Sequence, residues 1–555
     1  MRKSILTLIL LSSFTLAKAQ FIANPLNLNY RFQPISVSLS GELRENSYRE
    51  AADPVIELFK GKYYLFASPS GGYWSSEDLA NWQFIPCRSV DIISGYAPGV
   101  FTLGDTLYYM ANGSHRIFAT TNPDKDEWRE IPSQLGLSEI DPALFLDEET
   151  GRVYFYWGCS DKDPIMGVEI DPKNGFKPVG EPRVLITHNR DKYGWEVPGE
   201  NNDDDSRNGW NEAPAMIKYN GQYYLQYAAP GTEFRTYGDG VYVSDSPLGE
   251  FTYEESNPFS FKPGGFIGGA GHGHTFYDKY GNLWHVATMR LSVRNTFERR
   301  IGLFPSYFSG NGTLHAHTVW TDYPFRAPQK KVDFSKDNLN MDCRLLSYNK
   351  KVKSSSSLKN YSPQNANDEA IETWWSAASG KAGEWWQVDL GSMQHVKAIQ
   401  VNFADHDFPS LNSFAYQYKI LCSDDGKTWK TFIDRSDNEK DMPHELIVNN
   451  VHTRFLRIIN TKDMPHGKFS LYDFRVFGGE RNVESKIEKF SVVRDKNDRR
   501  IFRFDWKKAP DAEGYILRWG VKPNELHNAV MIRGNSYEGR FFNRDSEYFF
   551  ELTGF

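Results

Sequence analysis

The sequence predicts an all-β protein in which a five-bladed β-propeller is followed by two β-sandwiches. Three observations carry this prediction: a segment that recurs five times, a regular interval between its first copies, and a change of composition after about residue 330. A propeller blade of four strands takes roughly 40–50 residues, which is the interval found here.

Each copy of the recurring segment has an acid or small polar residue, a Pro or Thr, a short apolar strand, a Gly-centred turn and an aromatic strand. The copies begin at Asp53-Pro54, Ala97-Pro98, Asp141-Pro142, Glu212-Ala213-Pro214 and His274-Thr275. The first two intervals between prolines are 44 residues each, whereas the third is 72 residues and therefore contains an insertion. We assign the insertion to the loop that holds Trp195 and the polar run 201–208.

Composition excludes several classes of partner. The 555 residues carry a net charge of −7 and no basic block, so a nucleic-acid partner is not expected. Aromatic residues make up 15% of the chain, which suits carbohydrate faces and an all-β core alike. Beyond the N-terminus no apolar run reaches the roughly 18 residues of a membrane span.

The N-terminus has the pattern of a signal peptide over residues 1–19. Arg2-Lys3 is followed by an apolar stretch from Ile5 to Leu16 and by an Ala-Lys-Ala cleavage site. We therefore expect export, to the periplasm or the medium.

Four widely spaced cysteines (Cys87, Cys159, Cys343, Cys422) exclude a zinc knuckle and a disulfide scaffold. Two alternatives remain for these cysteines: buried free thiols, or a single bridge between Cys343 and Cys422.

Three domains follow the predicted leader. Residues 20–330 form the propeller and hold the recurring segments. Residues 338–479 contain alternating strands and tryptophan-rich motifs, and residues 485–555 contain a smaller set of aromatic strands. Each of these two regions predicts a β-sandwich.

The candidate chemistry lies at the starts of the recurring segments. Inner strands of propeller blades begin near the central axis, so we expect Asp53, Asp141 and Glu212 to converge there. Neighbouring carboxylates repel one another, which raises at least one pKa. Glycoside hydrolysis needs one protonated acid and one ionised carboxylate. An Asp-Pro pair is also common in turns that have no catalytic role. The catalytic interpretation therefore depends on three acids at nearly equivalent positions of the recurring segment.

These segments, together with Gly269-Ala270-Gly271-His272, resemble glycoside hydrolase family 43 over residues 45–328. The resemblance implies an inverting, mostly exo-acting enzyme on arabinose, xylose and some galactose polymers. It implies that Asp53 is the general base, Glu212 the general acid, and Asp141 the residue that tunes the acid. It further implies that His272 reaches a central channel holding a calcium ion or a water cluster; His274 competes for that role.

Substrate contacts are harder to assign. We interpret Trp74, Trp195 and Arg290 as sugar-binding candidates, with core or rim packing as the alternative for each. The second domain resembles the discoidin or coagulation-factor type C fold, similar to family 32 carbohydrate-binding modules, and the third resembles fibronectin type III. We expect a carbohydrate partner and a monomer.

Two functional classes stay open. The first is an exo-glycosidase for arabinofuranosyl, xylosyl or galactosyl-type residues of plant polysaccharides or oligosaccharides. The second is a non-catalytic carbohydrate-binding propeller, which would be expected to lose Asp53 or Glu212. An inverting enzyme should hold these two carboxyl groups about 6.5–9.5 Å apart.

Overall fold

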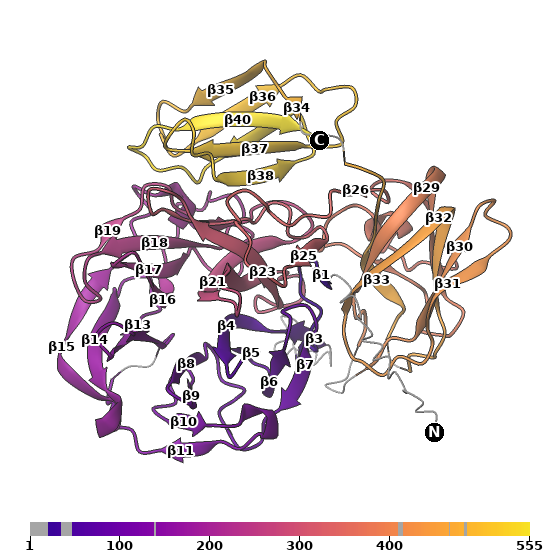
Figure 1. Cartoon of the computed structure of the whole chain (residues 1–555). Helices are drawn as coiled ribbons and strands as arrows, with labels where there is room; N and C mark the ends of the chain where they lie inside the picture. The colour runs from indigo at the N-terminus through magenta and orange to yellow at the C-terminus, as the bar shows by residue number, and fades with distance from the viewer. Residues whose placement is uncertain (1–19, 35–46, 138–139, 409–413, 466, 482–484) are drawn as a thin grey trace, which may run out of the picture.

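The computed structural model describes residues 20–34, 47–137, 140–408, 414–465, 467–481 and 485–555. The predicted leader, residues 1–19, lies outside the described residues. Strands dominate the described part, and its only helical segments are four short 3-10 turns. Figure 1 shows a ring of blades with one sandwich beside it and a smaller one above it. The predicted fold class is confirmed.

Five antiparallel blades form the ring, and a parallel contact joins the last two into one nine-stranded sheet. Their strands are β4–β7 (Ala52–Phe59, Lys62–Ser68, Gly72–Ser76, Gln83–Pro86), β8–β11 (Gly99–Leu103, Thr106–Met110, Ile117–Thr120, Arg129–Ile131), β12–β15 (Ala143–Asp147, Arg152–Trp157, Ile165–Asp171, Lys177–Ile186), β16–β19 (Glu212–Tyr219, Gln222–Ala229, Gly238–Ser244, Thr252–Tyr253) and β21–β24 (Gly268–Tyr277, Leu283–Arg290, Arg299–Phe308, Leu314–Ala316). A short strand β20 (Ser260–Phe261) pairs with β18. The predicted insertion is the segment 187–211 between the third and fourth sheets.

The first turn of every blade contains a glycine, as the sequence predicts. The glycines are Gly61, Gly104, Gly151, Gly221 and Gly281, with φ between +63° and +83°. A residue with a β-carbon rarely adopts this conformation, so glycine permits the tight connection between the first two strands. The aromatic strands that follow these turns pack between blades and build the core of the ring.

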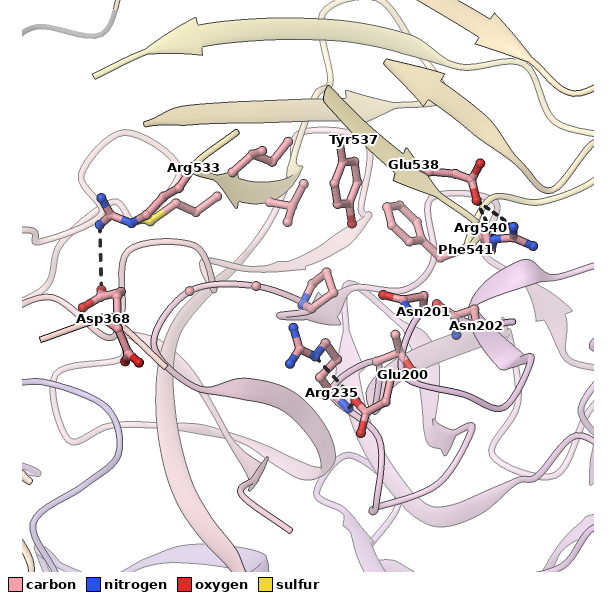
Figure 2. Close-up of a pocket in the computed structure, with 18 residues that line it drawn as sticks. Glu200, Asn201, Asn202, Arg235, Asp368, Arg533, Tyr537, Glu538, Arg540 and Phe541 are labelled. Carbon is pink, nitrogen blue, oxygen red and sulfur yellow. Dashed lines mark hydrogen bonds and ion pairs between the residues drawn. The ribbon is translucent and has the colours of Figure 1, made fainter. Parts of the chain in front are cut away.

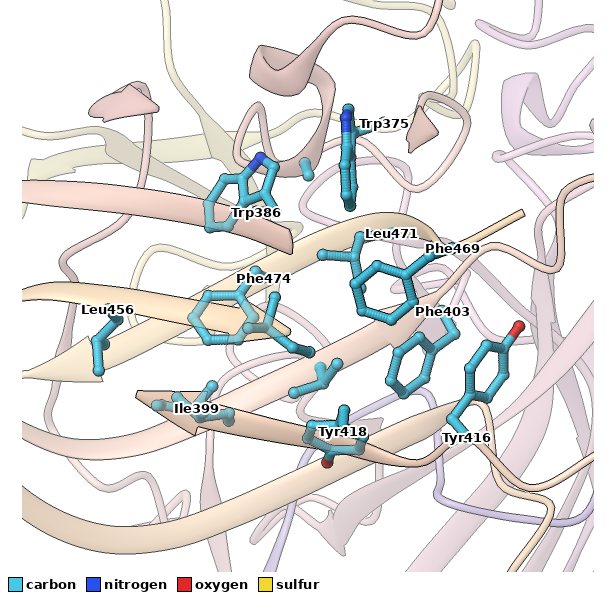
Figure 3. Close-up of a cluster of buried hydrophobic side chains, with 14 of the residues drawn as sticks. Trp375, Trp386, Ile399, Phe403, Tyr416, Tyr418, Leu456, Phe469, Leu471 and Phe474 are labelled. Carbon is cyan, nitrogen blue, oxygen red and sulfur yellow. The ribbon is translucent and has the colours of Figure 1, made fainter. Parts of the chain in front are cut away.

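The second domain is a β-sandwich whose strand order is β26-β33-β29-β32-β30-β31, with β27 and β28 at its side. The strands are β26 (Arg344–Leu345), β27 (Lys351–Ser354), β28 (Trp375–Ser376), β29 (Trp385–Phe403), β30 (Tyr418–Ser423), β31 (Lys430–Arg435), β32 (His444–Asn460) and β33 (Ser470–Gly478). Trp375 and Trp386 from the predicted motifs are fully buried in its core (Figure 3). These motifs therefore build the scaffold of the fold.

The third domain consists of a four-stranded sheet, β34-β40-β37-β38, and a three-stranded sheet, β35-β36-β39. The strands are β34 (Ser485–Lys486), β35 (Phe490–Arg494), β36 (Phe502–Trp506), β37 (Tyr515–Gly520), β38 (Asn528–Ile532), β39 (Ser536–Gly539) and β40 (Phe549–Gly554). Its core is continuous with the ring, because Phe541 packs in one cluster with Trp195 and Tyr227.

The terminal segments and domains are tied to the ring by specific contacts. β1 (Gln20–Ile22) pairs with β25 (Phe325–Ala327) beside the fifth blade. In the second domain, Asp405 forms a buried ion pair with Arg49 at 2.9 Å; Arg49 lies on β3 (Ser47–Glu50), which pairs with β2 (Arg31–Pro34).

All four cysteines are free thiols, so the Cys343–Cys422 bridge does not form. Within the described ranges no helix has the length and apolar character needed to cross a bilayer.

Candidate active site

The inner end of each blade bends through the left-handed region of backbone conformation. The five residues are Asp53, Ala97, Asp141, Ala213 and His272, with φ between +46° and +59°. Asp and His tolerate this region better than most residues. The shared conformation makes His272, and not His274, the fifth-blade equivalent of Asp53, and it places Glu212 one residue before its equivalent position. The predicted register is corrected by two residues in the fifth blade and by one in the fourth.

The bends surround a cavity of about 400 Å³ at the axis of the ring. Asp53, Asp141, Glu212 and His272 all line it. The structure therefore brings together the three acids and the histidine that the sequence singles out. Its other lining residues include Tyr96, Asn112, Cys159, Arg207, Asn208, Trp210, Glu233, Phe297 and Arg299.

Asp53 is a buried carboxylate that lies between the guanidinium of Arg299 and the imidazole of His272. Its Oδ1 accepts a hydrogen bond from Arg299 Nη1 at 3.0 Å and lies 3.4 Å from His272 Nδ1. Burial alone would raise the pKa of Asp53, but Arg299 and His272 outweigh it and hold this pKa below the ordinary value. Asp53 is consequently ionised at neutral pH, as a general base must be.

Asp141 has the opposite electrostatic environment. Burial raises its pKa to about 7; the positive charge of His272 opposes this, and the carboxylates of Glu212 and Asp53 add to it. Its Oδ2 accepts a hydrogen bond from the Ala213 amide at 3.2 Å and lies 4.0 Å from His272 Nδ1. Asp141 is therefore partly protonated at neutral pH, whereas Asp53 on the same cavity is ionised.

Glu212 receives three hydrogen-bond donors. Tyr237 donates its hydroxyl to Oε1, Trp210 Nε1 donates to Oε2 at 2.8 Å, and the Cys159 thiol donates to Oε2 at 3.3 Å. Donor atoms of Asp141, Cys159 and Glu212 all lie within 4.8 Å of one another. The Glu212 carboxyl group is thus fixed in orientation and placed against Asp141.

The mouth of the cavity is aromatic. Tyr96 and Phe297 line it, each with about 40% of its surface exposed, and their ring centroids are 5.7 Å apart. Flat apolar side chains beside a few fixed polar groups are typical of small-molecule sites. These two rings offer the faces on which a sugar could pack.

Two predicted sugar contacts are wrong because the side chains are buried. Trp74 and Trp195 are fully buried and do not line the cavity. Trp74 packs in the core shared by the first and fifth blades. Trp195 donates its indole N–H to Tyr253 at 2.9 Å in the core beneath the third domain.

Arg290 also lies away from the cavity. Its guanidinium donates to Glu372 of the second domain at 2.8 Å, to Glu200, and to the carbonyl of Glu233 at 2.9 Å. Arg290 therefore joins two domains, and its predicted role as a sugar contact is corrected.

Sequence reasoning missed Arg299 and the role of Cys159. Arg299 bridges Asp53 to a second buried acid, Glu50, to which its Nη2 donates at 2.6 Å. Adjacent charged residues at the start of an otherwise apolar strand, Arg299 and Arg300 in β23, are the sequence signal that could have identified it.

A narrow channel of about 40 Å³ continues along the axis below the acids. Among its lining residues only Asp141, His272 and His274 have donor side chains. Within the described residues His274 Nδ1 has no partner, and burial lowers the pKa of His274 to about 4. Calcium takes six to eight oxygen ligands, water included, and Asp141 is the one carboxylate among these side chains, so an ion in this channel would depend on water for most of its ligands. We assign no step to a metal.

Comparison with known proteins identifies two families. Residues 48–314 match the model of glycosyl hydrolases family 43, and residues 351–474 match the F5/8 type C domain. The xylosidase/arabinosidase 43A of Humicola insolens is 27% identical over 262 residues, covering 36% of this chain and 78% of that protein. The beta-D-galactofuranosidase xynD of Aspergillus niger is 22% identical over 282 residues, covering 44% and 75% respectively. A solved structure described as a glycoside hydrolase has a TM-score of 0.45 and 19% identity, and covers 77% of this chain and 97% of that one.

Proposed function

We propose that this chain, whose residues 48–314 match the model of glycosyl hydrolases family 43, is an exported, inverting and exo-acting enzyme. The chain is a glycosidase that hydrolyses O-glycosyl bonds. The observation that carries the proposal is the pair of opposite environments on one cavity: Arg299 and His272 hold the pKa of Asp53 below its ordinary value, whereas burial raises the pKa of Asp141, beside Glu212, to about 7.

In the proposed reaction Asp53 takes a proton from a water molecule, whose oxygen then bonds to the anomeric carbon from the face opposite the leaving group. Glu212 gives its proton to the glycosidic oxygen as the C–O bond breaks. Asp141 lies against Glu212 and orients it. After the products leave, Asp53 releases its proton to solvent and Glu212 takes one up from solvent, so both groups return to their starting states. Tyr237 and Trp210 hold the Glu212 carboxyl group toward the leaving oxygen.

Terminal arabinofuranosyl, xylosyl or galactosyl-type residues of plant polysaccharides or oligosaccharides are the proposed substrates. The relatives named for xylose, arabinose and galactofuranose support this range, and a cavity of about 400 Å³ suits one terminal sugar better than a long chain. We propose that the type C domain binds carbohydrate, that the third domain is a fibronectin type III-like module, and that the protein is a monomer.

Hydrolysis of aryl α-L-arabinofuranoside, β-D-xyloside, β-D-galactoside and β-D-galactofuranoside tests the proposal. We expect turnover of at least one of them, with inversion at the anomeric carbon observed by NMR, and loss of that turnover in Glu212→Gln. Binding of these sugars without turnover of any glycoside would favour a non-catalytic carbohydrate-binding propeller.

A further inference from the structure

The insertion 187–211 pairs with the third domain through its backbone. Tyr193 forms an antiparallel bridge with Asn543, the Gly194 amide donates to the Phe542 carbonyl at 3.1 Å, and the Arg544 amide donates to the Lys192 carbonyl at 2.7 Å. These contacts join residues about 350 positions apart in the sequence. The insertion is therefore held in place by a different domain from the one that it belongs to.

Gly194 shows how close this contact is. A β-carbon at Gly194 would lie 2.3 Å from the Arg540 carbonyl oxygen and 2.7 Å from the Phe542 carbonyl oxygen. The φ of Gly194 is not in the left-handed region, so this glycine is needed for the close approach and not for its own conformation. Backbone atoms cannot give way as the end of a side chain can.

Arg500 of the third domain ties together the two arms of the insertion. Its Nη1 donates to the Arg190 carbonyl at 2.9 Å, and its Nη2 forms an ion pair with Asp205 at 3.1 Å. Asp498 of its own domain fixes the guanidinium at 2.7 Å. Arg190 in turn donates to the carbonyls of Asp205, at 3.0 Å, and Arg207.

The third domain also covers the middle of the insertion. Figure 2 shows Asn201 and Asn202 facing Tyr537 and Arg540 across a crevice between the domains. The crevice has a volume of about 310 Å³ and is lined from both sides.

Immediately after Asp205 the insertion enters the catalytic cavity. Arg207 lines the cavity and pairs with Glu233 at 2.8 Å, and Asn208 lines it and donates to Asp161 at 2.9 Å. Trp210 then donates to Glu212 at 2.8 Å. The segment held by Arg500 thus leads within five residues to a donor on the catalytic acid.

We propose that the third domain is a positioning element of the active site, in which Arg500 holds the insertion so that Trp210 orients Glu212. The inference rests on the proposed function, because it assigns Glu212 the role of the acid. In this proposal the third domain contributes to catalysis by positioning Glu212, and it does not need to contact the substrate.

The test compares Arg500→Ala with Arg503→Ala in the full chain. Arg503 is a matched control, because its ion pairs are with Asp495 and Glu538 of its own domain. We expect Arg500→Ala to lower kcat about tenfold with little change in KM, since a small misplacement of a catalytic group costs this much or more. Hydrogen exchange at 187–211 should quicken in this variant alone.

A double-mutant cycle separates positioning from general destabilisation. Trp210→Phe should lower kcat by itself, and adding Arg500→Ala should lower it little further if both act through one hydrogen bond. Multiplicative losses, or wild-type kcat and wild-type exchange in Arg500→Ala, would overturn the inference. If the wild type turns over no glycoside, the proposed function fails, and the exchange measurement still reports on the contact.

Should Arg500→Ala not fold, Gly194→Ala gives a second measurement. Its matched control is Gly310→Ala, because Gly310 has open space where a β-carbon would stand. We expect slower turnover only in Gly194→Ala, and equal kcat in the two alanine variants would count against the inference.

Discussion

Replacing Arg299 by Gln removes the cation that keeps the buried Asp53 ionised. The guanidinium donates to Asp53 at 3.0 Å, so the centres of charge lie about 4 Å apart. At an effective dielectric constant of about 20, a pair at that distance interacts by ~4 kcal/mol, equivalent to about 3 pKa units. Glu50 shares the guanidinium, and we therefore expect the pKa of Asp53 to rise by about 2 units.

The pH dependence of kcat/KM measures this change. Asp53 must be ionised to accept a proton, so activity is lost as pH falls through the pKa of Asp53. In the wild type we expect this acid limb below the ordinary titration range of an aspartate, because Arg299 and His272 hold the pKa of Asp53 below its ordinary value. In Arg299→Gln the limb should move up by about 2 pH units, and activity should recover as pH increases.

Glu50→Gln is the matched control, because it leaves Arg299 to Asp53 alone. Its acid limb should stay in place or move to lower pH. The reasoning is refuted if the acid limb of a folded Arg299→Gln enzyme has the wild-type midpoint. Activity lost equally at every pH would show that Arg299 acts in another way, for example on the substrate.

Three further predictions concern other groups of the ring. Glu212→Gln should lower kcat by about 10²–10⁴-fold with little change in thermal midpoint, whereas Glu181→Gln, exposed on β15 and outside the cavity, should stay near wild type; equal losses would contradict the assignment. Burial, together with Glu212 and Asp141, raises the pKa of the Cys159 thiol, so iodoacetamide at pH 7 should leave Cys159 unlabelled by mass spectrometry, and rapid labelling would show an accessible thiolate. Burial raises the pKa of Glu196 to about 8, so from about pH 4.5 to 8 the folded state binds more protons than the unfolded state, and the free energy of unfolding should fall by up to about 5 kcal/mol. Denaturant titrations at pH 5 and pH 8 should show a smaller fall in the free energy of unfolding for Glu196→Gln than for the wild type. An equal fall in both proteins would exclude Glu196 as the source of the pH dependence.

The repeat made the ring predictable. Glycine turns and the 44-residue interval are local signals, and they identified the blades and the acids Asp53 and Asp141 without any knowledge of tertiary contacts. The fifth blade was misplaced by two residues because Gly273 follows His272 at the position where the other four blades have a proline.

The partners of the acids could not be predicted, since they are remote in sequence. Arg299 lies 246 residues from Asp53, and Cys159 lies 53 residues from Glu212 in a different blade. Aromatic residues gave errors for a related reason. Trp74 and Trp195 are of a residue type that commonly stacks on sugars. The packing of neighbouring blades and domains, however, decides whether an aromatic ring faces solvent or the core.

The left-handed bend at the inner end of every blade has a consequence for how this enzyme arose and can change. Ala97 and Ala213 adopt the same bend as Asp53 and Asp141 without contributing a reactive group, although this conformation costs an ordinary residue about 1–2 kcal/mol. A ring made by duplication of one ancestral unit would inherit such a bend five times, whether or not each copy has work to do. Residues 97 and 213 therefore have the backbone conformation of the two aspartates without their carboxyl groups. A single-base change from an alanine codon to an aspartate codon at residue 97, which lines the same cavity as Asp53 and Asp141, would place a further acid beside that cavity.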